Sequence, residues 1–322
     1  MAILIQNPMR GTPEVWKETL AKVLPKEEIR FWPDAGNPDD IEILIVGIPK
    51  LKELPTLPNL KLTISLLAGV DGMIKDPALP DVPLVKVEPP TGDRMMTEYA
   101  LSLVLYHHRN IPLYRINQAK HKWEGLPAKR AEDRTVGLLG YGTLSKPMTD
   151  KIKANGFNVA AWARTPKPDA DIEVFVGEEG FASFLARTEI AVCMLPLTPE
   201  TNGILNAKAF SLMPKGASII NLGRGPHVVN ADLIAALESG QLSSATLDVT
   251  DPEPLPADHP LWDAPGITIM PHVARRPSLA ETMPRSLKTC AGCGPTSLSF
   301  YWLTATLVTN CRERKDLAKK AR

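Results

Sequence analysis

The chain has 322 residues, of which 44% are hydrophobic and 23% are charged, a composition typical of soluble globular proteins that excludes a disordered chain or a coiled coil. Lysine and arginine number 37 against 36 acidic residues, so the net charge of +1 provides no general attraction to nucleic acid or to an anionic membrane. At roughly 150 residues per domain, the length predicts about two domains.

Two features of the sequence indicate a cytoplasmic protein that is not held in a membrane. The apolar start of the chain is broken by Gln6, Asn7 and Pro8 and has no preceding positive charge, so we interpret it as a first strand and not as a signal peptide. Cys193 lies within an apolar run, as a reduced core cysteine does, and four cysteines in so long a chain do not form a disulfide framework.

The first hundred residues alternate between short β-rich runs and helical stretches. A helix is expected to begin at Pro13 with Thr12 as its N-cap, and to turn Trp16, Leu20 and Val23 inward. Alternation of this kind predicts a parallel sheet covered by helices. The expected strands are residues 2–6, 43–46, 62–65 and 84–87.

A long helix is predicted over residues 97–120, with a kink at Pro112. Its inward stripe is expected to carry Leu101, Val104, Leu105 and His108. A second alternating series follows, in which one helix is bracketed by Asn230 as N-cap and Gly240 just past its end. The strands of this series are predicted at residues 136–139, 159–162, 190–194, 218–222, 245–249 and 267–270.

A glycine-rich turn follows the strand at residues 136–139 and opens a helix. Gly140 permits the tight turn, and Gly142 lets the backbone approach a pyrophosphate, which then meets the free amides of a helix N-terminus. Ser145 stands where this dinucleotide-binding fingerprint usually has its third glycine, a position that mainly governs helix–strand packing. The alternative is a structural glycine turn without a ligand.

The next strand ends in Arg164 and Thr165, with Lys167 close behind. NAD enzymes place an acid at this strand end, about 20 residues after the glycine motif, to bind the ribose 2′-hydroxyl. No acid stands there, and a guanidinium suits a 2′-phosphate, so the sequence favours NADPH over NADH. A solvated surface arginine is the alternative.

Two further polar groups follow predicted strands. Arg224, flanked by Gly223 and Gly225, lies where open α/β sheets bind ligands and could clamp a carboxylate. Of the 6 histidines, His272 also follows a strand, whereas we interpret the others as surface or packing residues: His107, His108, His121, His227 and His259. A carboxylate from the Asp248 to Glu253 stretch beside His272 would favour its charged form and fix its tautomer, as a general acid requires.

Over about residues 40–275 these motifs resemble the D-2-hydroxyacid dehydrogenase family. The resemblance rests on residues 213–229 (MPKGASIINLGRGPHVV), residues 231–237 (ADLIAAL), and the later Leu-Asp-Val, Glu-Pro-Leu-Pro and Pro-His-Val-Ala motifs in that order. The Arg-Gly-Pro-His-Val-Val and Trp-Ala-Arg-Thr-Pro-Lys stretches are most similar to the glyoxylate/hydroxypyruvate reductase branch.

The resemblance implies a role for each matching residue. Arg224, Glu253 and His272 take the family's catalytic positions, and Ala68, Gly69 and Val70 stand where backbone amides meet the substrate carboxylate, together with Arg224 and His272. Asp248 falls where the family holds the nicotinamide carboxamide, and no metal is expected. The expected cofactor-binding residues are Gly140, Tyr141, Gly142, Thr143, Leu144, Arg164, Thr165, Leu195, Pro196, Leu222, Gly223 and Asp248.

The implied fold has two α/β domains with Rossmann-like or flavodoxin-like parallel sheets and a cleft between them. Residues 1–100 and 273–322 would form the substrate domain, and residues 101–272 the dinucleotide-binding domain. The implied activity is NADPH-dependent reduction of a small 2-oxo acid, glyoxylate or hydroxypyruvate, with His272 as general acid, in a homodimer.

The resemblance ends before the C-terminus. The stretch after Ala274 is shortened, and residues 287–322 form an atypical tail, which we interpret as a shifted reading frame or a diverged end. Cys290 and Cys293 in this tail lack the context of a redox or zinc site. A cofactor-sensing protein of the corepressor type and a pseudoenzyme on the same fold remain alternatives.

Overall fold

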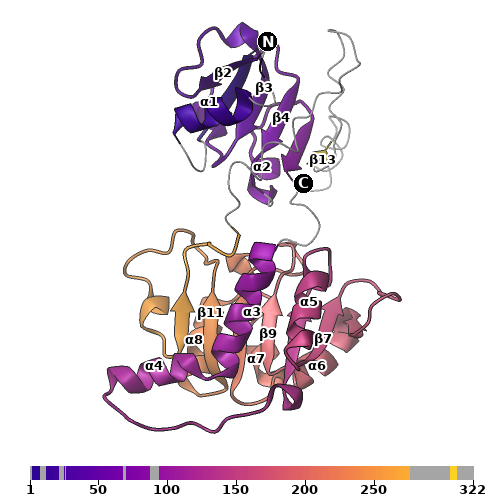
Figure 1. The fold of residues 1–322 in the computed structure, drawn as a ribbon, viewed down its shortest axis with the longest axis vertical. Helices are drawn as coiled ribbons and strands as arrows, with labels where there is room; N and C mark the ends of the chain where they lie inside the picture. Colours follow the sequence, from indigo (N-terminus) through magenta and orange to yellow (C-terminus); the bar gives the residue numbers. More distant parts are fainter. Residues whose placement is uncertain are drawn as a thin grey trace. The chain divides into compact units, whose positions relative to one another are not determined.

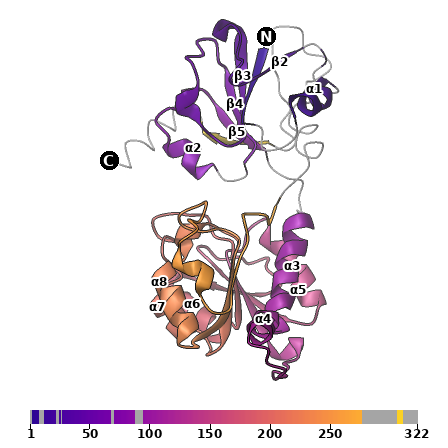
Figure 2. The same cartoon turned by 90° about the vertical axis from the view of Figure 1, so that its left-hand side faces the viewer.

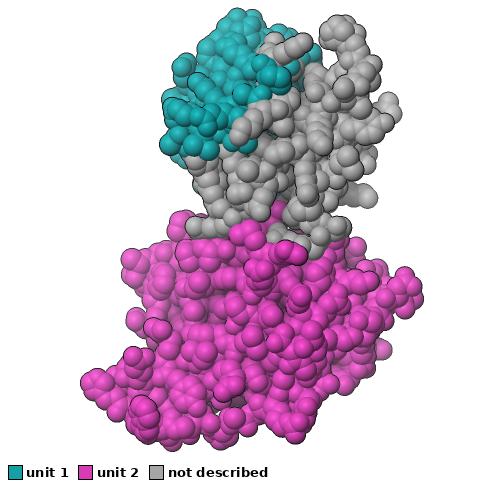
Figure 3. All heavy atoms as spheres, viewed as in Figure 1, with its two compact units in different colours: residues 1–90, 277–322 teal, residues 91–276 magenta. Residues whose placement is uncertain are grey.

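The structure is a computed structural model, and it describes residues 2–7, 12–21, 25, 27–67, 70–87, 94–275 and 305–309. The chain divides into two compact units, coloured separately in Figure 3. Unit 1 comprises residues 1–90 and 277–322, and unit 2 comprises residues 91–276.

Unit 1 contains a six-stranded sheet with the strand order β13-β5-β4-β3-β1-β2. Figure 1 labels β2, β3, β4 and β13 of this sheet. Five strands are parallel in the flavodoxin-like order, and the edge strand β13 is antiparallel to β5. The strands are β1 (Ala2–Gln6), β2 (Glu28–Phe31), β3 (Ile41–Val46), β4 (Leu62–Ser65), β5 (Leu84–Val87) and β13 (Ala305–Thr309).

Alternating side chains of β1, β3 and β5 contribute to two cores, one on each face of the sheet. Helix α1 (Pro13–Ala21) begins at Pro13 as predicted and packs Trp16 and Leu20 against one face, while Val23 lies outside the described residues. Helix α2 (Asp71–Lys75) brings Met73 to the core on the other face, and Figure 2 shows the two helices on opposite sides.

Unit 2 contains a seven-stranded, entirely parallel sheet with the strand order β12-β11-β10-β9-β6-β7-β8. All six strands predicted in this half are present, and β8 was not predicted. The strands are β6 (Thr135–Leu139), β7 (Asn158–Ala163), β8 (Glu173–Val176), β9 (Ile190–Cys193), β10 (Ala217–Asn221), β11 (Leu242–Leu247) and β12 (Ile267–Ile269).

Helices cover both faces of this sheet, as Figure 2 shows. On one face lie α6 (Gly177–Arg187), α7 (Ala207–Leu212) and α8 (Asn230–Glu238), with Phe184 and Phe210 fully buried beneath them. On the other lie α3 (Arg94–His108) and α5 (Ser145–Ala154). The two-domain parallel α/β fold predicted from the sequence is therefore confirmed.

The long helix predicted over residues 97–120 is two helices. Helix α3 ends at His108, and α4 (Ile111–Ala119) begins after Asn110, whose φ of 56° is left-handed. Pro112 is therefore not a kink inside one helix; it lies in the first turn of α4, where its missing N–H leaves no hydrogen bond unmade.

The buried stripe of α3 also differs from the predicted one. Val104 is buried as expected, but Leu101, Leu105 and His108 are only partly buried, and Ala100 and Leu103 face the core instead. His107 accompanies them, with Nδ1 at 2.8 Å from the Ser244 hydroxyl and Nε2 at 2.9 Å from the Thr246 hydroxyl. These two hydroxyls on β11 satisfy both ring nitrogens, so the helix turns its histidine inward.

Two smaller expectations concern single residues. Asn230 is not the predicted N-cap: it is the first residue of α8, and its side-chain amide donates to the Asp251 carbonyl. Gly240 has the left-handed φ of 71° expected just past the helix. Cys193 is fully buried in β9, and burial raises the pKa of its thiol to about 12.

Within the described ranges, no helix has the length and apolar character needed to cross a bilayer.

His107 should make the stability of unit 2 depend on pH. Burial, and then the charge of Arg134, lower the pKa of His107 from 6.5 to about 3, so the unfolded chain binds its proton more readily than the folded one. The free energy of unfolding should therefore fall as the pH drops below 6.5, by about 2 kcal/mol at pH 5 from this group.

Urea denaturation at pH 7.5, 6 and 5 tests this expectation. His107→Gln should remove that part of the pH dependence, and His121→Gln, at an exposed position, serves as the matched control. Parallel pH dependence in the wild type and His107→Gln would contradict the prediction.

Candidate functional site

The predicted cofactor and catalytic residues of unit 2 follow its strands at their carboxyl ends. The glycine turn follows β6, Arg164 follows β7, Leu195 follows β9, Arg224 follows β10, and His272 follows β12. Because all seven strands are parallel, these ends share one edge of the sheet, with the order reversal between β6 and β9 where doubly wound sheets bind ligands.

The turn after β6 has the geometry of a phosphate-binding loop. Gly140 has a φ of 101°, which a side chain would strain, and no atom lies within 4 Å of where a Cβ on exposed Gly142 would stand. This space beside the start of α5 can receive a pyrophosphate, so the residues present fit a dinucleotide.

Ser145 closes this turn from inside. Its hydroxyl donates to the Gly140 carbonyl at 2.8 Å and accepts from the Gly142 amide at 3.3 Å, and the residue is buried at the start of α5. The serine therefore replaces the third glycine of the fingerprint with a side chain that ties the loop together.

The other residues of the turn lie at its rim. Thr143 is exposed, and Leu144 is the N-cap of α5. The Tyr141 hydroxyl donates to the Asp171 carboxylate at 3.4 Å, and Lys153 holds that carboxylate at 2.7 Å. Partial burial, followed by the charge of Asp171, raises the pKa of Tyr141, which keeps this hydroxyl a donor.

Arg164 and Thr165 are exposed immediately after β7. A hydrogen bond from Thr198 and, to a smaller extent, the charge of Arg164 lower the pKa of Glu200, so the guanidinium stands close enough to the 198–200 turn to affect it. An exposed arginine at this strand end is available to a phosphate.

The backbone around Arg224 is held on both sides. Asn221 donates from its amide to the Arg224 carbonyl at 2.9 Å and accepts from the Gly223 N–H at 3.1 Å. The Arg224 N–H donates to Nδ1 of His227 at 2.9 Å, and its partly buried guanidinium donates to the Gly223 carbonyl at 2.7 Å. These four hydrogen bonds hold the loop that carries the arginine.

His227 and Asn221 support the site and were not predicted to do so. His227 is fully buried, and its Nε2 lies 3.3 Å from the Pro196 carbonyl. Because Nδ1 accepts a backbone N–H, Nε2 carries the ring proton, and the imidazole links the Leu195–Pro196 segment to the Arg224 loop. The available signal was the polar Asn221 at the carboxyl end of a buried strand, directly before the loop of Arg224.

Glu253 and His272 meet as predicted. Nδ1 of His272 and Oε1 of Glu253 are 2.6 Å apart, with side-chain exposures of 50% and 42%. The pair has the composition and contact expected of an acid–base group. His272 has a left-handed φ of 50°, an uncommon conformation for a residue with a side chain.

Asp248 lies beneath this histidine and is 1% exposed. Its carboxylate accepts the Tyr99 hydroxyl and the Val273 N–H, each at 2.9 Å, and the Ala274 N–H at 3.0 Å. Its backbone carbonyl also accepts the His272 N–H at 2.9 Å. Asp248 therefore holds the segment that carries His272.

The remaining predicted residues have plainer surroundings. Leu195, Leu222 and Gly223 are buried at the ends of β9 and β10, and Pro196 is exposed. Of the three residues expected to meet the substrate carboxylate, Ala68 and Gly69 lie outside the described residues, and Val70 is the buried N-cap of α2 in unit 1.

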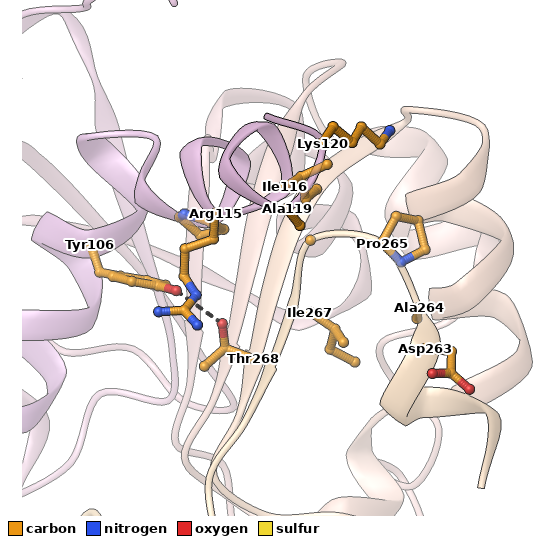
Figure 4. A pocket seen from close by; sticks show the side chains of 12 residues that line it. Tyr106, Arg115, Ile116, Ala119, Lys120, Asp263, Ala264, Pro265, Ile267 and Thr268 are labelled. Carbon is orange, nitrogen blue, oxygen red and sulfur yellow. Dashed lines mark hydrogen bonds between the residues drawn. The ribbon is translucent and has the colours of Figure 1, made fainter. Parts of the chain in front are cut away.

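A separate pocket of about 310 Å³ lies between α4 and β12 (Figure 4). Tyr106, Arg115 and Thr268 line it, and the Tyr106 and Thr268 hydroxyls are 3.3 Å apart. On the β12 side the pocket is lined by residues 263–268, which lie before and at the start of this strand. His272 follows the opposite, carboxyl end of β12. The pocket is distinct from the site described above.

Comparison with known proteins identifies relatives of this chain. Residues 101–274 match the family model for the NAD-binding domain of D-isomer specific 2-hydroxyacid dehydrogenases. A glyoxylate/hydroxypyruvate reductase A from Serratia proteamaculans is 38% identical over 292 residues, which cover 89% of this chain and 91% of that protein.

Solved structures agree with this match. A D-isomer specific 2-hydroxyacid dehydrogenase from Xanthobacter autotrophicus Py2, in complex with NADPH and MES, aligns with a TM-score of 0.79 and 36% identity over 89% of this chain and 93% of that one. An NADPH-dependent glyoxylate/hydroxypyruvate reductase from Sinorhizobium meliloti, in complex with NADP and sulfate, aligns with a TM-score of 0.74 and 34% identity over 85% and 89%.

Gly225 should be irreplaceable for a reason independent of any ligand. A Cβ on this residue would stand 1.9 Å from the Thr250 carbonyl oxygen, so Gly225→Ala must move the backbone next to Arg224. We expect a loss on the order of 3 kcal/mol, seen as a fall of roughly 6 °C or more in Tm. Gly142→Ala, which meets no atom within 4 Å, should unfold like the wild type. Equal melting of the two variants would show that the Thr250 carbonyl does not exclude a side chain at Gly225.

Proposed function

Because the chain belongs to the D-isomer specific 2-hydroxyacid dehydrogenase family, we propose that it is an NADPH-dependent reductase of a small 2-oxo acid, glyoxylate or hydroxypyruvate. The observation that carries this proposal is the 2.6 Å pair of His272 and Glu253 at the edge of the sheet where Arg224 follows β10. An imidazole backed by a carboxylate, together with a guanidinium, is the equipment needed to protonate and polarise a carbonyl.

The cofactor would be held along the carboxyl edge of the unit 2 sheet. The turn from Gly140 to Leu144 would take the pyrophosphate, Leu195 and Pro196 would flank the adenosine, and Asp248 would face the nicotinamide carboxamide with Leu222 and Gly223 nearby. When bound, the reduced nicotinamide supplies a hydride to the carbonyl carbon.

A preference for NADPH over NADH is supported by the end of β7. Arg164 and Thr165 stand there without an acid, and a guanidinium binds a phosphate with paired, charge-assisted hydrogen bonds. The relatives from Xanthobacter and Sinorhizobium were crystallised with NADPH and NADP, respectively.

The substrate would be bound by Arg224 and protonated by His272. Arg224 would hold the carboxylate and polarise the neighbouring carbonyl, with the backbone amides of residues 68–70 as further predicted contacts. Nδ1 of His272 is engaged by Glu253, so Nε2 is the ring nitrogen that would pass a proton to the carbonyl oxygen. General-acid assistance of this kind contributes about 10² to 10⁴ in rate.

The assay for this function follows NADPH absorbance with glyoxylate, hydroxypyruvate and pyruvate, with NADH run in parallel. We expect turnover with glyoxylate or hydroxypyruvate and a lower KM for NADPH than for NADH. Tight NADPH binding without turnover of any 2-oxo acid would instead support a cofactor sensor or a pseudoenzyme.

Two arginine substitutions separate the proposed roles. Arg224→Ala should lower kcat by roughly 10²-fold or more, because it removes the group that polarises the carbonyl. Arg164→Ala should raise the KM for NADPH by about 10-fold or more, the effect of one charged hydrogen bond, and leave the KM for NADH unchanged. If both variants lost only cofactor affinity, the role given to Arg224 would be wrong.

The remaining expectations concern the oligomeric state and the cellular location of the protein. The resemblance predicts a homodimer and a cytoplasmic location, and exposed apolar side chains on α4, Ile111 and Tyr114, are compatible with a subunit contact. Light scattering of the purified chain would test the dimer.

A further inference from the structure

Tyr99 contacts the predicted catalytic region from a helix that carries none of the predicted site residues. It lies in the second turn of α3, which crosses one face of the unit 2 sheet (Figure 1), and its hydroxyl donates to Oδ1 of Asp248 at 2.9 Å. The two residues are 149 positions apart in sequence, so their contact depends on how α3 packs.

The Asp248 carboxylate is buried, and a buried charge is costly unless hydrogen bonds compensate it. A carboxylate offers about four acceptor sites, and three of those on Asp248 receive the Tyr99 hydroxyl and the amides of Val273 and Ala274. Among these three donors, Tyr99 is the one that comes from a side chain and from a separate element.

The segment held by this carboxylate carries His272, the proposed general acid. His272 has a φ of 50°, a conformation that persists only where the surroundings impose it. The restraints here include the carbonyls of Asp248 and Met270, which both accept the His272 N–H, and the Asp248 carboxylate, which accepts the two amides that follow. A shift of Asp248 would therefore move the imidazole relative to Glu253.

We propose that Tyr99 is a positioning residue for the reaction: its hydroxyl anchors the Asp248 carboxylate and thereby fixes the backbone that presents His272. This inference rests on the proposed function. Burial and the neighbouring Asp248 charge raise the pKa of Tyr99, so the hydroxyl stays protonated and remains a donor through the neutral pH range.

Tyr99→Phe tests the inference, and Tyr106→Phe is a matched control. Tyr106 lies two turns further along α3 and also makes a side-chain hydrogen bond, to Thr268 on β12 at 3.3 Å, but it contacts neither Asp248 nor the His272 segment. Each substitution removes one hydroxyl and keeps the ring, so a general effect of weakening α3 would appear in both variants.

We expect Tyr99→Phe to lower kcat by roughly 10- to 100-fold while KM for the 2-oxo acid changes by less than about threefold, because a misplaced acid slows protonation more than binding. Tyr106→Phe should keep the wild-type kcat. Hydrogen exchange of the Val273 and Ala274 amides should be faster in Tyr99→Phe than in the wild type or Tyr106→Phe, since both amides donate to Asp248.

Equal kcat in Tyr99→Phe and Tyr106→Phe, or a parallel loss in both, would overturn the inference. Failure of the proposed function is a separate result, in which the wild type oxidises NADPH with neither 2-oxo acid. The exchange measurement then decides alone: unchanged exchange at Val273 and Ala274 refutes the anchoring by Tyr99, and faster exchange supports it.

Discussion

The parallel alignment of seven strands in unit 2 is the constraint on which the site depends. A parallel sheet brings the carboxyl ends of all its strands to one edge, and the first loop after each strand therefore starts there. The glycine turn after β6, Arg224 after β10 and His272 after β12 are separated by long stretches of sequence. They lie along one edge of the sheet because helices cover both of its faces, and the loops at the carboxyl ends of the strands remain uncovered by those helices.

Hydrogen bonds join the loops that lie side by side along this edge. His227 connects the loop after β9 to the loop after β10, and Asp248 connects β11 to the segment after β12. Both groups are buried, where an unpaired polar atom is costly, so each must be paired within the protein. The pair of Glu253 and His272 is half exposed and can meet a ligand.

Much of the fold followed from local patterns. Runs of apolar residues marked most of the strands because strands buried on both faces of a sheet need no alternation. Strands β2, β8 and β13 were not predicted, and the first two of these are short and only partly buried. The division of residues 97–120 into α3 and α4 was not predicted, because the pattern of apolar residues does not show that Asn110 adopts a left-handed conformation.

By itself the sequence determined the parallel α/β fold and the family, because the glycine turn, the Arg224 motif and the His272 motif each follow a recognisable strand. It also placed Glu253 with His272, a pairing borne out at 2.6 Å. Only the tertiary structure decided the contacts of Tyr99, Asn221 and His227, and the inward turn of His107. Those contacts are hydrogen bonds to residues brought close by packing, and neither the partner nor the geometry of such a bond is encoded in local periodicity.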